Sequence, residues 1–233
     1  MPYSKSRARL NFEELSTKLL RLSKEASYKK SGFGYEHQNL IFQSAIFSIC
    51  AGVEEYNKNF FEDYIFECKK NMIPLTKLPI NLRLMSLLRE QKELYKQFIF
   101  NGDEAKTLEK ISRSKHIYDI MLDEGPIQEN IRAGVILGTN KYPSIKNLKI
   151  IYNRIGISDI FTMLNKRSGS NIKDQLASFL SIRESISHQT PPPLTYIDIK
   201  RHLHNLRKLI NLLDRINFTE LSKVSGTDCW PCM

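Results

Sequence analysis

The sequence has no long apolar run, and it has few cysteines. Its longest apolar stretches are short and interrupted by charged residues, so we expect no membrane span. The first nine residues are basic but contain no apolar segment, which argues against a secretory signal and favours the cytoplasm. With only four cysteines in 233 residues, we expect no disulfide framework. What remains is the composition of an ordinary globular protein.

The cysteines fall into two groups. Cys50 and Cys68 lie in helical patterns on or near apolar faces, which is typical of reduced core thiols. Cys229 and Cys232 form Cys-Trp-Pro-Cys, a spacing found in redox and zinc motifs. No strand precedes this pair, and no second pair or suitably spaced histidine follows it. We therefore expect no metal site and no cofactor, with a redox or zinc-linked regulator as the remaining alternative.

Positive charge is in excess and unevenly placed. The net charge is +10, and residues 141–215 hold 13 Lys and Arg against 5 Asp and Glu. A basic field of this kind favours an anionic partner, nucleic acid first among them. It is equally compatible with a solvated surface that keeps the protein soluble.

Apolar residues recur at helical spacing almost throughout, and no alternating strand segment stands out. We predict helices over about 10–28, 35–72, 81–100, 104–122, 143–156, 158–165, 171–188 and 195–217. The stretch 127–142 is ambiguous because its glycines weaken a helix. The pattern indicates a helical extension over residues 1–34, one helical domain over 35–217 and a flexible tail over 218–233.

Arg183 lies on the wrong face of its predicted helix. On a helical wheel it falls at the centre of the apolar stripe formed by Leu176, Phe179 and Ile186. An arginine there costs free energy unless its charge is paired or lines a cleft. Arg183 is thus either a functional cation or a structural arginine bonded to a carboxylate or to carbonyl groups.

His188 closes the same helix, just before three prolines. In a continuing helix it would point about 140° away from Arg183, so the two would not share a site within one chain. The prolines could turn the backbone out of the helix, or a second copy of the chain could supply the complementary side. His188 is suited to acid–base work, since an imidazole titrates near neutrality, or it simply caps the helix.

A basic face follows on the last predicted helix. Helical spacing of i, i+4, i+7 and i+8 brings together Lys200, His204, Arg207 and Lys208. This face either binds RNA phosphates or is an ordinary solvated helix face.

The segment from Leu180 to Gln189 resembles the signature of HEPN-domain ribonucleases, in which an Arg, a polar residue and a short variable stretch precede a His at a helix end. The final helix is similar to the family's C-terminal helix. Ala51-Gly-Val-Glu-Glu-Tyr56 looks like the "alanine, apolar, Glu, aromatic" element of the RiboL-PSP-HEPN branch. The resemblance covers roughly residues 35–215.

The resemblance implies an all-α, HEPN-like up-and-down bundle with additional helices, and a homodimer in which both motifs face one cleft. It implies metal-independent RNA cleavage, with His188 as general acid or base and Arg183 stabilising charge on the phosphate. Family members commonly serve as toxins or phage-defence effectors, so an antitoxin or defence partner is expected. Glu184 stands where the family often has Asn, Asp or His, and its carboxylate would pair with Arg183, tune His188 or repel RNA. Glu54 is a supporting carboxylate or an exposed helix charge. The alternative is a non-catalytic module that binds RNA or protein.

Overall fold

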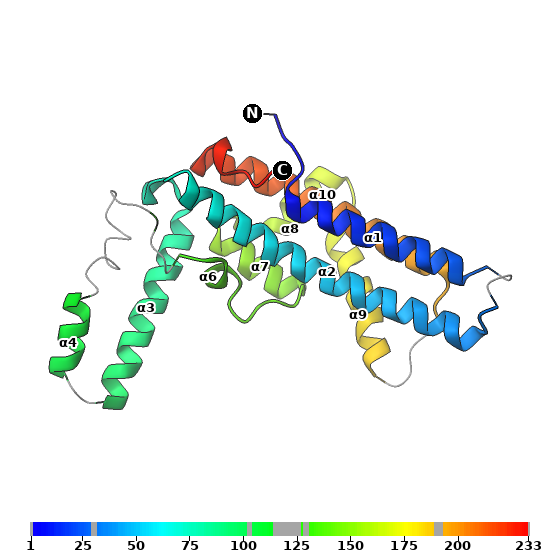
Figure 1. Ribbon diagram of the computed structural model, residues 1–233, viewed down its shortest axis with the longest axis horizontal. Helices are drawn as coiled ribbons and strands as arrows, with labels where there is room; N and C mark the ends of the chain where they lie inside the picture. The colour runs from blue at the N-terminus through cyan, green and yellow to red at the C-terminus, as the bar shows by residue number, and fades with distance from the viewer. Residues whose placement is uncertain are drawn as a thin grey trace.

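The computed structural model, which describes residues 2–28, 32–101, 104–113, 127, 131–188 and 193–232, is built from helices (Figure 1). The helices are α1 (Arg7–Ala26), α2 (Tyr35–Lys70), α3 (Ile80–Asn101), α4 (Glu104–Arg113), α6 (Ala133–Leu137), α7 (Ile145–Arg154), α8 (Ile160–Ser168), α9 (Ile172–Ser187) and α10 (Tyr196–Ser225), with 3₁₀ turns at Leu75–Lys77 and Thr227–Cys229. No strand occurs within these ranges, and one isolated bridge pairs Ser6 with Cys232. The expected all-α fold is confirmed.

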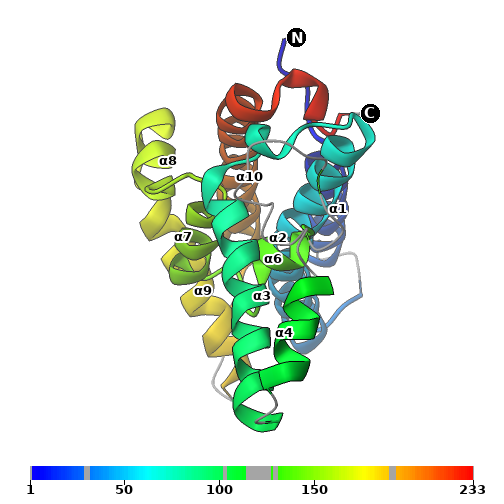
Figure 2. The same cartoon turned by 90° about the vertical axis from the view of Figure 1, so that its left-hand side faces the viewer.

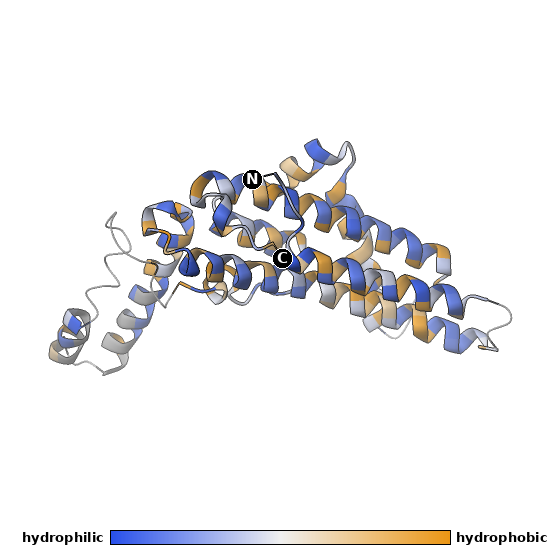
Figure 3. Cartoon of the chain, turned by 45° about the horizontal axis from the view of Figure 1, so that its top comes forward, coloured by the Kyte–Doolittle hydropathy of each residue, from blue (hydrophilic) through white to orange (hydrophobic). Residues whose placement is uncertain are grey.

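Three long helices form the centre of the bundle. α1 packs against α2 and α10, and α10 also contacts α8 and α9 (Figures 1 and 2). The long apolar stripe of α2 supplies the largest buried side chains, including Tyr56, Phe60 and Phe61. Figure 3 shows hydrophilic and hydrophobic residues interspersed along the helices, as expected when each helix buries one face. None of the helices in the described part of the chain is both long and apolar enough to cross a membrane.

A second layer lies beside this centre. α6 packs against α2, α3 and α7, and α7 continues the contacts to α8 and α9. α3 leaves the body at one end and carries α4 alongside it (Figure 2). The ambiguous stretch of the sequence thus contains the short helix α6, which ends at Gly138 with φ at 57°. The predicted continuation of α4 to Leu122 lies outside the described residues.

Local capping signals place several helix starts. Thr195 accepts a hydrogen bond from the backbone N–H of Asp198, whose carboxylate accepts from the backbone N–H of Thr195, so the expected capping box is confirmed. Asn171 caps α9 in a similar way through the backbone N–H of Asp174. These caps determine where α9, which carries Arg183, and α10, which follows it, begin.

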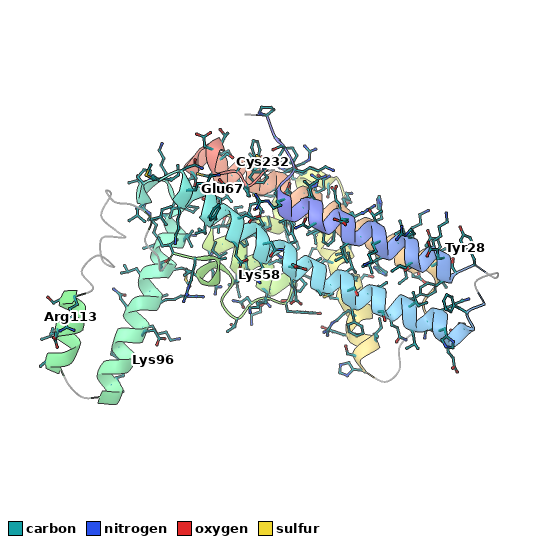
Figure 4. The ribbon with its side chains drawn as sticks, in the orientation of Figure 1. Tyr28, Lys58, Glu67, Lys96, Arg113 and Cys232 are labelled. Carbon is teal, nitrogen blue, oxygen red and sulfur yellow. The ribbon has the colours of Figure 1, made fainter. Side chains whose placement is uncertain are left out.

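The prediction of a flexible tail after residue 217 differs from the structure. α10 continues to Ser225, and Trp230 is only 4% exposed. The indole ring lies 5.2 Å from that of Phe218 and 5.5 Å from that of Phe60, and its Nε1 donates to the carbonyl of Ser4 at 2.9 Å. Cys232, labelled in Figure 4, pairs with Ser6 of the segment before α1. Burial of the aromatic residues holds the segment against the body.

The N-terminal residues belong to the same core. Asp214 of α10 is fully buried and accepts hydrogen bonds from Tyr3 Oη at 2.7 Å, Ser6 Oγ at 2.5 Å and Tyr56 Oη at 3.3 Å. Burial raises the pKa of this carboxyl group, while its bonds to Ser6 and Tyr3 act in the opposite direction. The expected extension over residues 1–34 is therefore anchored to the last helix by a buried polar network.

Candidate active site

Arg183 projects from α9 where this helix packs against α2. The buried face of α9 consists of Ile172, Leu176, Phe179 and Leu180. Arg183 follows Phe179 by one helical turn, so it continues this face toward the end of the helix. Its side chain is half-buried. Arg183 thus lies on the apolar side of α9, where the helical wheel predicts it.

Two aromatic rings hold the Arg183 guanidinium group. Its Cζ atom lies 5.4 Å from the ring centre of Phe47 on α2 and 5.3 Å from that of Tyr142, in the connection between α6 and α7. A cation over an aromatic face contributes about 0.5–1 kcal/mol at exposed sites and more when it is desolvated. The rings thus fix the position of the charge without neutralising it.

The same guanidinium group has no polar partner within the described residues. No carboxylate oxygen there lies within 4 Å of it, and it donates no hydrogen bond to them. Its Nε atom is buried without a partner. Unsatisfied donors of a buried cation cost free energy, and a bound anion would remove much of that cost. Arg183 therefore makes no ion pair with a described residue, and its guanidinium group is chemically able to receive a negatively charged group.

Glu54 and Cys50 lie on the face of α2 that carries Phe47. Burial raises the pKa of Glu54, and the positive charges of Arg183 and Lys141 oppose this shift. Burial and the Glu54 charge raise the pKa of the Cys50 thiol to about 11, so it stays protonated at neutral pH. Glu54 therefore lies within electrostatic reach of Arg183, and the structure brings together these two predicted residues.

A small hollow opens beside Glu54. It has a volume of about 260 Å³ and is lined by Ala51, Glu54, Glu55, Lys58, Leu137 and Lys141. Lys58 is labelled on α2 in Figure 4. Its two lysines are balanced by its two glutamates, so the lining carries no net charge and the hollow by itself does not favour an anionic ligand.

His188 stands at the end of α9. Ser187 is the last helical residue, and His188 has φ of −103° and ψ of 104°, so the backbone leaves the helix there. The side chain is exposed, as is that of Glu184. The charge of Glu184 contributes to raising the pKa of Tyr142, so Glu184 lies near the ring that contacts Arg183. Glu184 nevertheless makes no ion pair with Arg183. Pro191 and Pro192, which were expected to end the helix, lie outside the described residues.

Sequence reasoning missed the two rings that hold Arg183. Phe47 precedes Glu54 by seven residues, and this spacing puts both on one face of α2. A half-exposed aromatic residue on the face of a suspected carboxylate was thus a usable signal. Tyr142 follows the ambiguous glycine-containing stretch, and nothing in the local pattern predicted its contact with α9.

The expected RNA-binding face of α10 is divided by internal contacts. Lys200 and His204 are exposed. Arg207 donates to the carbonyl of Glu13 at 3.0 Å and to Oγ1 of Thr17, both on α1.

Lys208 of α10 extends toward the end of α8, whereas Arg207 extends toward α1. Its Nζ atom donates to Oγ of Ser170 at 2.8 Å and to the carbonyl of Ser168 at 3.3 Å, in the connection between α8 and α9. The groove of about 630 Å³ between α1 and α10 also contains Glu13 and Glu14, whose charges offset the basic residues. The four predicted residues therefore do not form one freely available cationic surface.

Within the described residues, no group of three or more His, Cys, Asp or Glu side chains is arranged to hold a metal ion. The candidate site instead combines a cation fixed by two rings, a neighbouring carboxylate and an exposed imidazole at a helix end.

Comparison with known proteins identifies the family of this helical bundle. The model of the RiboL-PSP-HEPN family matches residues 11–216, which include α2, the Arg183–His188 segment and most of α10. Comparisons with curated proteins and with solved structures found no match. Because the family match covers most of the chain and agrees with its all-α architecture, the chain belongs to the RiboL-PSP-HEPN family.

Proposed function

We propose that this protein is a metal-independent endoribonuclease whose site combines Arg183 and His188. The observation that carries the proposal is the Arg183 guanidinium group, which two rings hold in place and which has no acidic partner in the described chain. Membership of a HEPN family supports RNA as the substrate class. A fixed cation with unused donors matches the charge that develops on a phosphate during its transfer.

The reaction needs one proton to leave and one to arrive. The ribose 2′-oxygen attacks the adjacent phosphorus while His188 accepts the 2′-hydroxyl proton. The bond from phosphorus to the 5′-oxygen breaks, and a protonated imidazole gives its proton to that oxygen. Arg183 stabilises the additional negative charge on the phosphate oxygens. The products are a 2′,3′-cyclic phosphate and a 5′-hydroxyl group.

The site is completed by a second copy of the chain. α9 stays helical through Ser187, so Arg183 and the end of the helix retain a large angular offset. A two-fold pair in which the ends of α9 face each other would bring the arginine of one chain to the histidine of the other, and it would do so twice, because each contact of an isologous interface occurs twice. The homodimer therefore forms part of this proposal.

The two carboxylates have different roles. Glu54 lies beside Arg183 and Lys141 and supports the site by orienting these cations. Glu184 is exposed at the position where RNA would approach, so its charge opposes binding of the phosphate backbone. We expect Glu184→Gln to lower KM for RNA and to leave the cleavage pattern unchanged.

The biological role that fits this activity is a cytoplasmic toxin or phage-defence effector, restrained by a partner protein. Induced expression in a bacterial host tests that role. We expect growth arrest and RNA fragmentation with the parent and neither with His188→Ala. Equal growth arrest by both proteins would contradict it.

Purified protein incubated with RNA in EDTA tests the chemistry. We expect His188→Ala to lower the cleavage rate by about 10²–10⁴, since general acid–base catalysis contributes a factor of that size. Unfolding curves of the two proteins control for loss of structure. Unchanged cleavage by His188→Ala would refute the site, and salt-dependent RNA binding without cleavage by either protein would favour the non-catalytic alternative.

Mixing two inactive variants tests the two-chain site. Arg183→Gln and His188→Ala chains are unfolded, mixed in equal amounts and refolded together. Random pairing makes half of the dimers mixed, and each mixed dimer holds one intact composite site, so about a quarter of the parent activity should return. A site formed within one chain predicts no recovery.

A further inference from the structure

A second basic cluster lies between α3, α6 and α7, away from the α10 face. Four cations from separate parts of the chain line a pocket of about 570 Å³: Arg89, Lys92, Arg132 and Arg154. Glu93 is the one carboxylate on its described lining, and it faces Lys96 at 3.2 Å. The lining is therefore strongly positive.

Backbone carbonyl groups hold two of these arginines. Arg89 Nη1 donates to the carbonyl of Gly134 at 2.7 Å. Arg154 Nη1 donates to the carbonyls of Ile136 at 2.7 Å and Leu137 at 3.0 Å. The carbonyls of Ile136 and Leu137 belong to the C-terminal end of α6, where backbone carbonyls favour cations, whereas the Gly134 carbonyl shares its oxygen between Arg89 and the backbone N–H of Gly138. Their positions are fixed, and no carboxylate of the described residues forms an ion pair with either arginine.

The two guanidinium groups are close to one another. A Cβ atom placed on Gly138 would lie 2.7 Å from Arg89 Nη2 and 3.0 Å from Arg154 Nη1, so these nitrogens are within about 6 Å of each other. Burial lowers the pKa of Arg154, and the like charge of Arg89 lowers it further. Two neighbouring cations that have no acidic partner in the described part of the chain form a setting that an anion would stabilise.

Gly138 keeps this space open. Its φ of +57° is a conformation that residues with side chains rarely adopt, and any side chain there would meet the Arg89 guanidinium. Thr139, which also lines the pocket, is only three residues before Tyr142, so their Cα atoms lie within about 11 Å. Figure 1 shows α6 between α3 and α9. One connection thus lines the pocket and also contacts Arg183.

We infer that this pocket binds a phosphate group, supplied by the RNA strand whose neighbouring phosphate enters the Arg183–His188 site. The pocket has the charge and fixed donors for a phosphate, and its distance from Tyr142 favours an adjoining part of the same strand over a separate ligand. The choice of RNA as the source rests on the proposed function. A free phosphate or nucleotide is the other source of the same chemistry.

Binding of an RNA that cannot be cleaved tests the inference. A 2′-O-methyl RNA 12-mer lacks the attacking hydroxyl group, so its affinity is measured independently of catalysis, by fluorescence anisotropy at several salt concentrations. The test variant is Lys92→Gln/Arg132→Gln, because both side chains are exposed and make no bond to a described residue. Lys146→Gln/Lys149→Gln removes the same charge from exposed positions of α7 outside the pocket.

We expect the pocket variant to weaken binding about tenfold and to reduce the slope of log K against log salt by about 1.4, since each lost phosphate contact on a single strand accounts for about 0.7. The α7 control should change the slope by less than half as much. Equal effects of both pairs would overturn the inference, because net charge alone would then explain them. Arg89→Gln adds a second pocket variant, with its fold checked by circular dichroism.

Calorimetric titration with pyrophosphate separates the two sources of phosphate. Weak binding of pyrophosphate, together with the expected loss of RNA affinity in the pocket variant, supports the RNA strand. Tight pyrophosphate binding that the pocket variant abolishes, with unchanged RNA affinity, would overturn the assignment to RNA. A protein that cleaves no RNA but shows the pocket-dependent affinity would refute the proposed function and leave this inference standing.

Discussion

Arg183 and Arg207 are both half-buried arginines on helices of the same bundle, yet their guanidinium groups have different partners. Arg207 donates to a backbone carbonyl and a hydroxyl group of α1, whereas Arg183 lies between the rings of Phe47 and Tyr142 and donates to no described residue. The first joins two helices, and the second leaves its guanidinium donors unused by the described residues, as the proposed phosphate-binding role requires. The partners of a basic residue, rather than the local density of positive charge, indicate which one can act on a ligand.

The largest expected effect is the loss of RNA cleavage when Arg183, but not Arg207, is replaced. Arg183→Gln removes the fixed cation and should lower the RNA cleavage rate by about 10²–10³, the usual cost of losing one charge-stabilising donor at a reacting centre. Its free energy of unfolding should change by less than about 1 kcal/mol, because the loss of the two ring contacts is offset by removing a buried Nε atom that has no partner among the described residues. Single-turnover cleavage and urea unfolding of the same preparation measure both quantities. A large loss of stability with unchanged cleavage would reverse the roles assigned here.

The converse substitution should affect stability instead. Arg207→Ala removes the bonds to Glu13 and Thr17, so we expect the free energy of unfolding to fall by about 1–2 kcal/mol. The cleavage rate per folded molecule should stay within twofold of the parent. Lys200→Ala is the matched control, because Lys200 is an exposed cation of the same helix and should change stability by less than about 0.5 kcal/mol. Equal stability of the two variants would show that the contacts of Arg207 with α1 contribute little.

The sequence predicted the parts of this comparison that depend on local patterns. Apolar periodicity placed α9 and put Arg183 on its buried side, and the capping box at Thr195 located the start of α10. Both signals arise within a few turns of one helix, where spacing alone determines which residues are neighbours.

Contacts between distant segments were not predictable in this way. Tyr142 meets Arg183 because the connection after α6 packs beside α9, and Arg207 meets Thr17 because α1 packs along α10. Trp230 contacts Phe60 of α2 and Ser4 of the segment before α1, so part of the segment predicted to be a flexible tail packs into the core. These outcomes depend on tertiary packing, about which local periodicity gives no information.

A smaller effect tests how Arg183 is held. Tyr142→Leu removes one ring from the guanidinium group, and we expect the cleavage rate to fall about tenfold, since a partly desolvated cation–π contact contributes about 1–2 kcal/mol. Tyr142→Phe keeps the ring and should retain most of the activity, so this pair separates the ring from the hydroxyl group. Equal losses of cleavage rate in both variants would assign the effect to the Tyr142 hydroxyl group and show that the ring does not contribute.

The smallest expected effect concerns the packing between the helices that carry the two arginines. His202 of α10 is 2% exposed and lies 5.9 Å from the ring of Phe179, which precedes Arg183 by one turn. Burial lowers the pKa of His202 below its ordinary value of 6.5, the charge of Arg201 lowers it further, and that of Asp198 opposes the shift. Above pH 6.5 the imidazole is neutral in both the folded and the unfolded chain, so it adds no pH dependence.

Below pH 6.5 the unfolded chain takes up a proton on His202 that the folded chain binds more weakly, so the free energy of unfolding falls as the pH drops toward the folded pKa. Urea midpoints between pH 7.5 and 5.5 should show this decline in the parent and a shallower one in His202→Phe, whose ring cannot titrate. His204→Gln is the control, because His204 is exposed on the same helix and its replacement should leave the decline unchanged. If the urea midpoint of His202→Phe declined with pH as steeply as that of the parent, another group would cause the pH dependence, and the contact between α9 and α10 would not be pH-sensitive.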